Sequence, residues 1–331
     1  MACEATSYAR AGLVGNPSDG YYGKTISFTV RNYMAKVSLY ESAELEIVPS
    51  IRDRSRYGSI RELVGDVRAY GYYGAIRLMK ATIRRFADYC ESEGIELPDR
   101  NFSMRYRSTI PRHVGLAGSS ALVTAAMRCL MEFYEVDIAQ PVLPNVSLSV
   151  ETQELGISAG LQDRVVQVYE NCVFMDFDRE LMAQQGHGRY EEIDAGLLPS
   201  LFIAYRTDFS EGSEVFHNTI RERWLAGDPE VVRAMKDFAT YTEEVRTLLE
   251  AGRGSEIGPW LDRNFDRRRS IAELDPADIA LVERARAAGA SCKFAGSGGA
   301  IVGTYDDEET YARICEALEG TPTVVFKPEI T

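Results

Sequence analysis

Apolar and polar residues alternate over residues 25–49 and again over residues 102–111. A period of two is typical of strands that face a core on one side. Between these stretches, apolar residues recur at intervals of three and four from Ile76 to Cys90, and Gly94 follows them. This spacing predicts an amphipathic helix that ends before the glycine.

From about residue 195 onward, short strand-like stretches alternate with helical periodicity. The strands are predicted at 201–206, 291–294, 300–305 and 323–327, and the helices at 228–251, 277–288 and 308–318. Two strands joined by a turn in the middle of such a series are typical of a split βαβ, ferredoxin-like domain. We therefore predict two domains, 1–195 and 196–331, with the boundary near Gly196.

The composition limits the class of protein without identifying its activity. The 331 residues are 45% hydrophobic and 26% charged, as in soluble globular proteins. A net charge of −13 argues against a broad nucleic-acid surface, which needs dense Lys and Arg. No secretory leader or membrane-length apolar run occurs, and the six cysteines form no C-x-x-C pair. We expect a cytoplasmic protein with neither a nucleic-acid nor a membrane partner.

The most informative segment is a small-residue loop over 110–121, which lies between a predicted strand and a predicted helix. Glycines let the backbone approach a ligand, and the unpaired N–H groups at a helix start favour anions. The segment therefore predicts a phosphate cradle. The alternative is a tight turn, since Gly and Ser also dominate ordinary turns. It is not the P-loop G-x-x-x-x-G-K-[ST].

Two further glycine-rich segments and one acidic segment complete the candidate chemistry. In residues 8–25 a short apolar strand is followed by a polar loop, and residues 293–300 lie between two predicted strands. A turn and a plain hairpin are the respective alternatives. Glu151 and Asp163 could supply the two carboxylates that phosphoryl transfer needs, one for magnesium and one for the acceptor proton. The alternative, which is the commoner case for an isolated acidic residue, is that both are solvated surface acids.

Taken in their order along the chain, the four segments resemble the GHMP small-molecule kinase superfamily. The 110–121 loop departs from the superfamily pattern by one extra residue. Residues 15–19, 159–164 and 293–299 further resemble the glucuronokinase family. The resemblance implies an α+β, two-domain GHMP kinase fold. Its N-terminal domain is β-rich α/β, ribosomal S5 domain 2-like, and its C-terminal domain is a ferredoxin-like split βαβ domain.

The resemblance also implies a reaction and its partners. ATP would phosphorylate D-glucuronate at the anomeric hydroxyl with the help of Mg²⁺, giving glucuronate 1-phosphate for UDP-glucuronate synthesis. Two alternatives stay open. One is a related anomeric kinase for a neutral sugar such as galactose, arabinose or fucose, and the other is a non-catalytic kinase-fold sugar sensor.

By the family pattern, Asp163 is the catalytic base and Arg10 stabilises it, while Ser120 and Glu151 hold Mg²⁺. The residues implied to bind the ATP phosphates lie in one run: Pro111, Gly115, Leu116, Ala117, Gly118, Ser119, Ser120 and Ala121.

The substrate site implied by the resemblance draws on both ends of the chain. Asn16, Asp19 and Tyr22 match the sugar-binding loop, and Gly296 and Gly298 would let the second domain close over the ligands. A uronic acid also needs a cation for its carboxylate, and arginine recognises a carboxylate through two parallel hydrogen bonds. The candidates are Lys24, Arg164 and the arginine run 267–269, for which a solvated helix face is the alternative.

Overall fold

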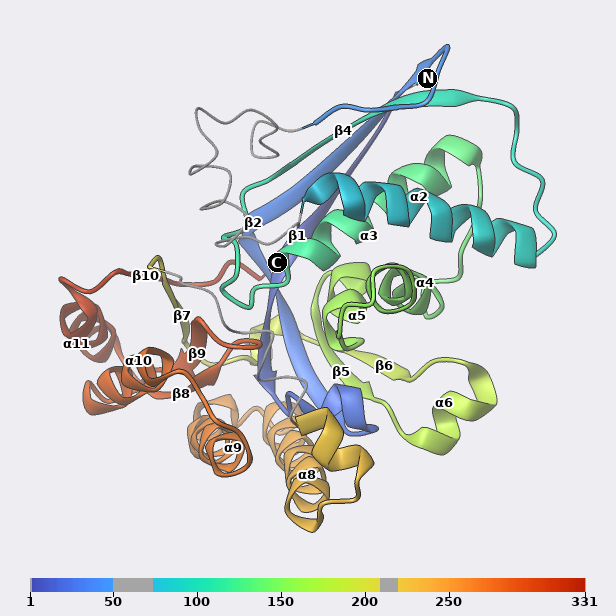
Figure 1. Ribbon diagram of the computed structural model, residues 1–331. Coiled ribbons are helices and arrows are strands. Elements are labelled where there is room, and N and C mark those ends of the chain that lie inside the picture. The colour runs from blue at the N-terminus through green and yellow to red at the C-terminus, as the bar shows by residue number, and fades with distance from the viewer. Residues whose placement is uncertain (1, 50–73, 209–219, 331) are drawn as a thin grey trace, which may run out of the picture.

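The computed structural model describes residues 2–49, 74–208 and 220–330 and contains two β-sheets with helices packed around them (Figure 1). The first sheet has the strand order β3-β4-β2-β5-β6, with β1 paired to β2. Its strands are β1 (Ala2–Val14), β2 (Lys24–Ser42), β3 (Glu46–Ile47), β4 (Asn101–Ser108), β5 (Cys172–Asp176) and β6 (Arg189–Ile193). The strands predicted at 25–49 and 102–111 correspond to β2, β3 and β4.

The second sheet has the order β10-β7-β9-β8, and every neighbouring pair in it is antiparallel. Its strands are β7 (Leu201–Arg206), β8 (Ser291–Phe294), β9 (Ala300–Thr304) and β10 (Thr323–Phe326). Helices connect β7 to β8 and β9 to β10, while β8 and β9 form a hairpin. This is the predicted split βαβ arrangement. All strands of the first sheet precede Gly196 and all strands of the second follow it.

Helices pack against the first sheet. In the second sheet, helices lie between β7 and β8 and between β9 and β10 in the sequence. Those before Gly196 are α2 (Ala75–Ser92), α3 (Gly118–Tyr134), α4 (Leu143–Ser149), α5 (Gln162–Tyr169) and α6 (Arg179–Gln185), with short turns η1 (Ser18–Tyr21) and η2 (Val150–Glu154). Those after it are α8 (Pro229–Glu250), α9 (Gly258–Ile271), α10 (Pro276–Ala287) and α11 (Glu308–Leu318). The helix predicted from Ile76 to Cys90 is α2.

Helix α9 is the long element that the hydrophobic pattern does not predict. Its inward face carries Asn264 and Arg268 between apolar residues, and both polar side chains are buried. Because buried polar residues interrupt the apolar stripe, the 3.6-residue period is weak in this segment. The helix can therefore be predicted only when the partners of these side chains are known.

One hydrophobic core joins the two sheets. Leu13 and Phe28 of the first sheet belong to the same buried cluster as Val245 and Leu249 of α8 and Val302 of β9. A shared core holds two parts of a chain at fixed positions, since separating them would expose apolar surface to water. Within the described residues, no helix has the length and apolar character needed to cross a membrane.

Candidate active site

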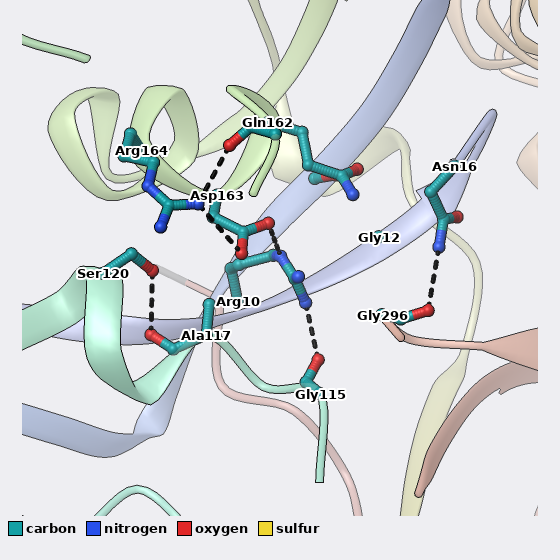
Figure 2. Close-up of polar contacts among 12 residues, drawn as sticks. Arg10, Gly12, Asn16, Gly115, Ala117, Ser120, Gln162, Asp163, Arg164 and Gly296 are labelled. Carbon is teal, nitrogen blue, oxygen red and sulfur yellow. Dashed lines mark hydrogen bonds and ion pairs between the residues drawn. The ribbon is translucent and has the colours of Figure 1, made fainter. Parts of the chain in front are cut away.

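Strand β1 is the meeting point of the three glycine-rich segments. The amide of Arg10 donates to the carbonyl of Leu116 in the predicted phosphate loop at 3.3 Å. Two residues further along β1, the amide of Gly12 donates to the carbonyl of Ala295 in the β8–β9 loop at 2.7 Å. The strand then runs into the predicted sugar loop. Segments that are far apart in the sequence thus share one edge of one strand (Figure 2).

The predicted phosphate loop and the β8–β9 loop touch through backbone atoms. Gly115 has φ +67°, and a Cβ atom there would lie 2.7 Å from the carbonyl oxygen of Gly298. A Cβ atom on Gly296 would lie 2.2 Å from the carbonyl oxygen of Gly115. Such a close approach needs residues without side chains. Gly298 itself has φ +150° and lies against Asp278, whose Oδ2 accepts a hydrogen bond from the amide of Gly299 at 2.9 Å.

Helix α3 begins at Gly118, directly after Ala117 in the left-handed region at φ 62°. No side chain caps this end, and no described group accepts a hydrogen bond from the amides of Gly118, Ser119 or Ser120. The amide of Ala121 is already bonded to the carbonyl of Ala117 at 3.2 Å. The first turn therefore presents three unused donors at the positive end of the helix dipole, which favours a negatively charged ligand.

Three other residues of the predicted phosphate loop, Pro111, Leu116 and Ala121, offer no side-chain donor to a ligand. Pro111 is half-buried at the start of the loop and has no backbone N–H to offer. The side chain of Leu116 is buried in the core, and Ala121 is fully buried. The loop's central donors are thus the backbone groups at the start of α3.

Asp163 lies in the first turn of α5, next to Arg10 of β1. Arg10 Nε donates to Asp163 Oδ1 at 2.6 Å, and Nη1 of the same guanidinium donates to the carbonyl of Gly115 at 2.7 Å (Figure 2). Nη1 also donates to the carbonyl of Ala295 at 3.1 Å. Arg10 is 4% exposed, so this network lies within the protein. The acid keeps 18% of its side chain exposed, which leaves it open to a ligand.

Arg164 faces the other oxygen of the same acid. Its Nη1 lies 3.6 Å from Asp163 Oδ2 and donates to the carbonyl of Gly160 at 2.9 Å. Its Nη2 forms an ion pair with Oε2 of Glu151, and both side chains are almost fully buried. Ser120, also buried, donates its hydroxyl proton to the carbonyl of Ala117 at 3.1 Å. Glu151 is therefore already neutralised by a guanidinium group.

The sugar loop is held in place by α9. Asn264 Oδ1 accepts from the amide of Gly15 at 2.7 Å, and its Nδ2 donates to the carbonyl of Asn16 at 3.1 Å. The Asn16 side chain is buried and donates from Nδ2 to the carbonyl of Gly296 at 3.4 Å. Its Oδ1 is buried without a hydrogen-bond partner. A buried acceptor without a partner is costly, so this atom is a candidate contact for a ligand hydroxyl.

Asp19, in η1, lies close to Asp163. Its Oδ2 accepts from the amide of Gln162 at 3.4 Å, and Gly160 leaves room for it because a Cβ there would meet this oxygen at 2.0 Å. Burial, followed by the negative charge of Asp163, raises the pKa of Asp19 to about 7. A carboxyl group that holds its proton near neutral pH can donate a hydrogen bond as well as accept one.

The last two predicted sugar-loop residues lie further out. Tyr22 is 45% exposed and adopts φ 61° between the Trp224 ring and the guanidinium of Arg179. Lys24 forms ion pairs with Glu243 and, at 3.3 Å, with Asp176. Lys24 is thus neutralised by two of the protein's own acids.

Three polar residues that sequence reasoning gave no role hold the site together. Gln167 Nε2 donates to the carbonyls of Ala117 at 2.9 Å and Tyr8 at 3.2 Å, and thereby ties the phosphate loop to β1. Asn264 holds the sugar loop, and Lys293 Nζ donates to the carbonyl of Gly12. One signal was available for Gln167, since it follows Asp163 by four residues and so shares its helix face.

The described residues contain no preformed metal cluster. Among the described residues, no three His, Cys, Asp or Glu side chains lie together in a way that would hold a metal ion. Mg²⁺ usually takes only one or two protein carboxylates and completes its shell with water and substrate phosphate oxygens. A carboxylate also has more acceptor sites than one guanidinium fills. Glu151 therefore keeps acceptor capacity beyond its ion pair with Arg164, while the Ser120 hydroxyl already donates to the carbonyl of Ala117.

Comparison with known proteins identifies the relatives of this chain. Residues 77–171 match the GHMP kinases N terminal domain. The chain is 45% identical to Glucuronokinase 1 of Arabidopsis thaliana over 307 residues, which cover 91% of this chain and 84% of that protein. It is also 45% identical to Probable glucuronokinase 2 of the same plant, with 90% and 83% covered.

Solved structures show the same fold at much lower identity. Lactococcus lactis galactokinase, determined with galactose, superposes with a TM-score of 0.78 at 14% identity and covers 100% of this chain and 94% of its own. Streptococcus pneumoniae phosphomevalonate kinase gives a TM-score of 0.75 at 14% identity, with both chains fully covered. The predicted two-domain α+β fold is thereby confirmed.

Proposed function

Because the chain belongs to the glucuronokinases among the GHMP kinases, we propose that it transfers the γ-phosphoryl group of ATP to the anomeric hydroxyl of D-glucuronate. The product is glucuronate 1-phosphate, a precursor for UDP-glucuronate synthesis. One observation carries the proposal: Arg10 bonds both the candidate base Asp163 and the carbonyl of Gly115 in the phosphate loop. The acid and the phosphate loop are thus held together.

The phosphate groups of ATP bind at the start of α3 in this proposal. The unused amides of Gly118, Ser119 and Ser120 face the ligand, and the loop from Pro111 to Ala117 shapes the cradle. Backbone donors and the helix dipole suit the negative charge of a triphosphate. Because these donors are already in place, little reorganisation is needed as charge develops during transfer.

Asp163 acts as the general base. It accepts the proton of the sugar's anomeric hydroxyl while the sugar oxygen attacks the γ-phosphorus. Arg10 fixes one carboxylate oxygen through the 2.6 Å hydrogen bond, and Arg164 lies 3.6 Å from the other. Phosphoryl transfer depends chiefly on positioning and electrostatic stabilisation, which these contacts supply.

The sugar lies between the sugar loop and the β8–β9 loop. The unpartnered Oδ1 of Asn16 accepts a hydroxyl proton, and Asp19 can donate or accept near neutral pH. Tyr22 covers the outer side with its exposed ring. Gly296 and Gly298 keep the opposite wall free of side chains. Fixed donors and acceptors of this kind distinguish one sugar stereochemistry from another.

Ser120 and Glu151 are the residues that would hold Mg²⁺. When bound, the metal neutralises charge on the phosphate oxygens. Glu151 would share its carboxylate between the metal and Arg164, which already bonds it. The protein would work in the cytoplasm, where its six unpaired cysteines stay reduced.

A substrate panel tests the proposal. Purified protein is incubated with MgATP and, separately, with glucuronate, galactose, arabinose or fucose, and ADP release is followed. We expect turnover with glucuronate and a ³¹P NMR signal from a sugar 1-phosphate. Preferential turnover of a neutral sugar would replace this proposal with a neutral-sugar kinase, and binding without turnover would replace it with a sensor.

A further inference from the structure

Four cationic side chains are buried in the described part of the chain, and they divide into two pairs. Arg10 and Arg164 form ion pairs with the acids Asp163 and Glu151. Arg268, 5% exposed, and Lys293, 1% exposed, have no acid within ion-pair distance among the described residues. Buried charges are normally paired, because burying an unpaired ion is costly. The second pair therefore lacks an anion.

Arg268 lies at the boundary between the sugar loop and the β8–β9 loop. Its Nη1 donates to the carbonyl of Gly296 at 2.7 Å, and its Nη2 donates to that of Ser297 at 2.9 Å. The carbonyl of Gly296 also accepts from Asn16 Nδ2 at 3.4 Å. The guanidinium and the sugar-loop amide thus meet on one oxygen. Helix α9 places Asn264 one turn earlier on the same face, and that side chain holds the sugar loop.

The guanidinium has donors left over. A guanidinium carries five N–H groups, and two are used on the loop carbonyls. The Nε of Arg268 is buried and has no hydrogen-bond partner. The guanidinium carbon of Arg268 lies over the Phe294 ring, 5.2 Å from the ring centroid. The Nε edge, together with the second hydrogen of a terminal nitrogen, has the parallel-donor geometry that a carboxylate accepts.

The surrounding charges do not neutralise the pair. Asp278 is the acid with the largest effect on Arg268, but it accepts from Arg206 at 2.9 Å and from the amide of Gly299. Burial lowers the pKa of Arg268 to about 10, so it stays charged at neutral pH. Burial, and then the charges of Arg268 and Arg10, lowers the pKa of Lys293 well below its usual value. An anion at this place would relieve that repulsion.

The other candidate cations are already occupied. Lys24 is paired with Asp176 and Glu243, and Arg164 is paired with Glu151. The neighbours of Arg268 in the arginine run also have partners, since Arg267 pairs with Asp237 at 2.7 Å and Arg269 with Glu283 at 2.9 Å. Only the middle residue of the run faces the site.

We propose that Arg268 binds the carboxylate of the sugar-acid substrate through its unused N–H groups. This inference rests on the proposed function and assigns the residue that selects a uronic acid over a neutral sugar. The ATP phosphates are the other possible source of an anion, and the experiment separates the two.

The test compares D-glucuronate with D-glucuronamide, its uncharged amide, in wild-type protein and in Arg268→Gln and Arg268→Lys variants. Losing one partner of a buried charged hydrogen bond costs about 2–5 kcal/mol, so kcat/KM for glucuronate should fall by at least about 30-fold in Arg268→Gln. Turnover of glucuronamide should fall by a smaller factor, because this substrate is affected only by the lost hydrogen bonds to Gly296 and Ser297, and the KM for ATP should stay near wild type. Arg268→Lys, which keeps the charge, should retain part of the preference for glucuronate. Arg263→Gln, exposed on the same helix, is the matched control.

Equal losses with glucuronate and glucuronamide would overturn the inference and make Arg268 a support of the loop alone. A raised KM for ATP with an unchanged sugar preference would assign the anion to the nucleotide and overturn it as well. Both outcomes leave the proposed function intact. In contrast, a wild-type protein that does not turn over glucuronate would overturn the proposed function itself, and this inference with it.

Discussion

Arg10 Nε donates to Asp163 Oδ1 at 2.6 Å, although the two residues are 153 positions apart in the sequence. The same guanidinium bonds the carbonyl of Gly115 at 2.7 Å. One side chain therefore fixes the distance between a candidate base and the phosphate loop. Catalysis by positioning depends on such fixed distances, because a small displacement of a reacting group has a large effect on rate.

Replacing Asp163 with Asn removes the proton acceptor and keeps the shape of the side chain. We expect turnover to fall by about 10²-fold or more, in line with general-base contributions. ATP affinity should be unchanged, since the backbone donors of α3 are untouched. Steady-state kinetics and calorimetric titration with ATP measure the two effects. Asp306→Asn, at an exposed position before α11, is the control. Turnover near wild type would exclude Asp163 as the base.

Replacing Gly296 with Ala places a methyl group 2.2 Å from the carbonyl of Gly115. The β8–β9 loop and the phosphate loop must then move apart, and overpacking of this kind costs about 1–3 kcal/mol. Expressed as free energies, the loss in kcat/KM should exceed the loss of stability that the thermal unfolding temperature reports, because the strain is at the ligand site. Gly20→Ala, where no atom lies within 4 Å of the added carbon, should leave stability unchanged. Wild-type kinetics in Gly296→Ala would contradict the close contact.

The titration of Asp19 predicts a pH dependence of stability. Its pKa is raised to about 7 in the folded protein, while an unfolded chain has an aspartate pKa of about 4. The folded state thus binds this proton more tightly, and stability is lost as pH rises through this window. Relative to Asp19→Asn, whose amide does not titrate, the wild-type free energy of unfolding should decrease from pH 4 to pH 7. Urea unfolding across this range measures the difference. A difference that is constant with pH would show that the Asp19 pKa is not raised.

The buried pair of Glu151 and Arg164 predicts a non-additive effect on stability. Glu151→Gln removes the nearer counter-charge of the buried guanidinium and leaves only Asp163 Oδ2 at 3.6 Å, and breaking a buried pair costs about 3–5 kcal/mol. The double variant Glu151→Gln with Arg164→Met removes both charges and should be more stable than Glu151→Gln alone. Denaturant unfolding of the single and double variants completes the cycle. Additive losses would mean that the two side chains are not coupled.

Much of the fold was predictable from local pattern. The alternation over residues 25–49 and the helical spacing from Ile76 to Cys90 correspond to β2, β3 and α2, and the order of elements after Gly196 predicted the second sheet. Such features depend on neighbours two to four positions away. Helix α9 was missed because Asn264 and Arg268 replace apolar residues on its buried face. Their partners lie in segments far away in the sequence.

The residue types available for chemistry follow from the amino-acid sequence, as does the family, through the resemblance. Which of these residues meet depends on how the chain folds. In the folded protein, Lys24 and Arg164 are paired with nearby acids. Arg268 and Lys293 have no acid within ion-pair distance among the described residues. The physical reason is that the state of a buried charge depends on which groups surround it in space. Those groups come from strands and loops that only the shared core brings together.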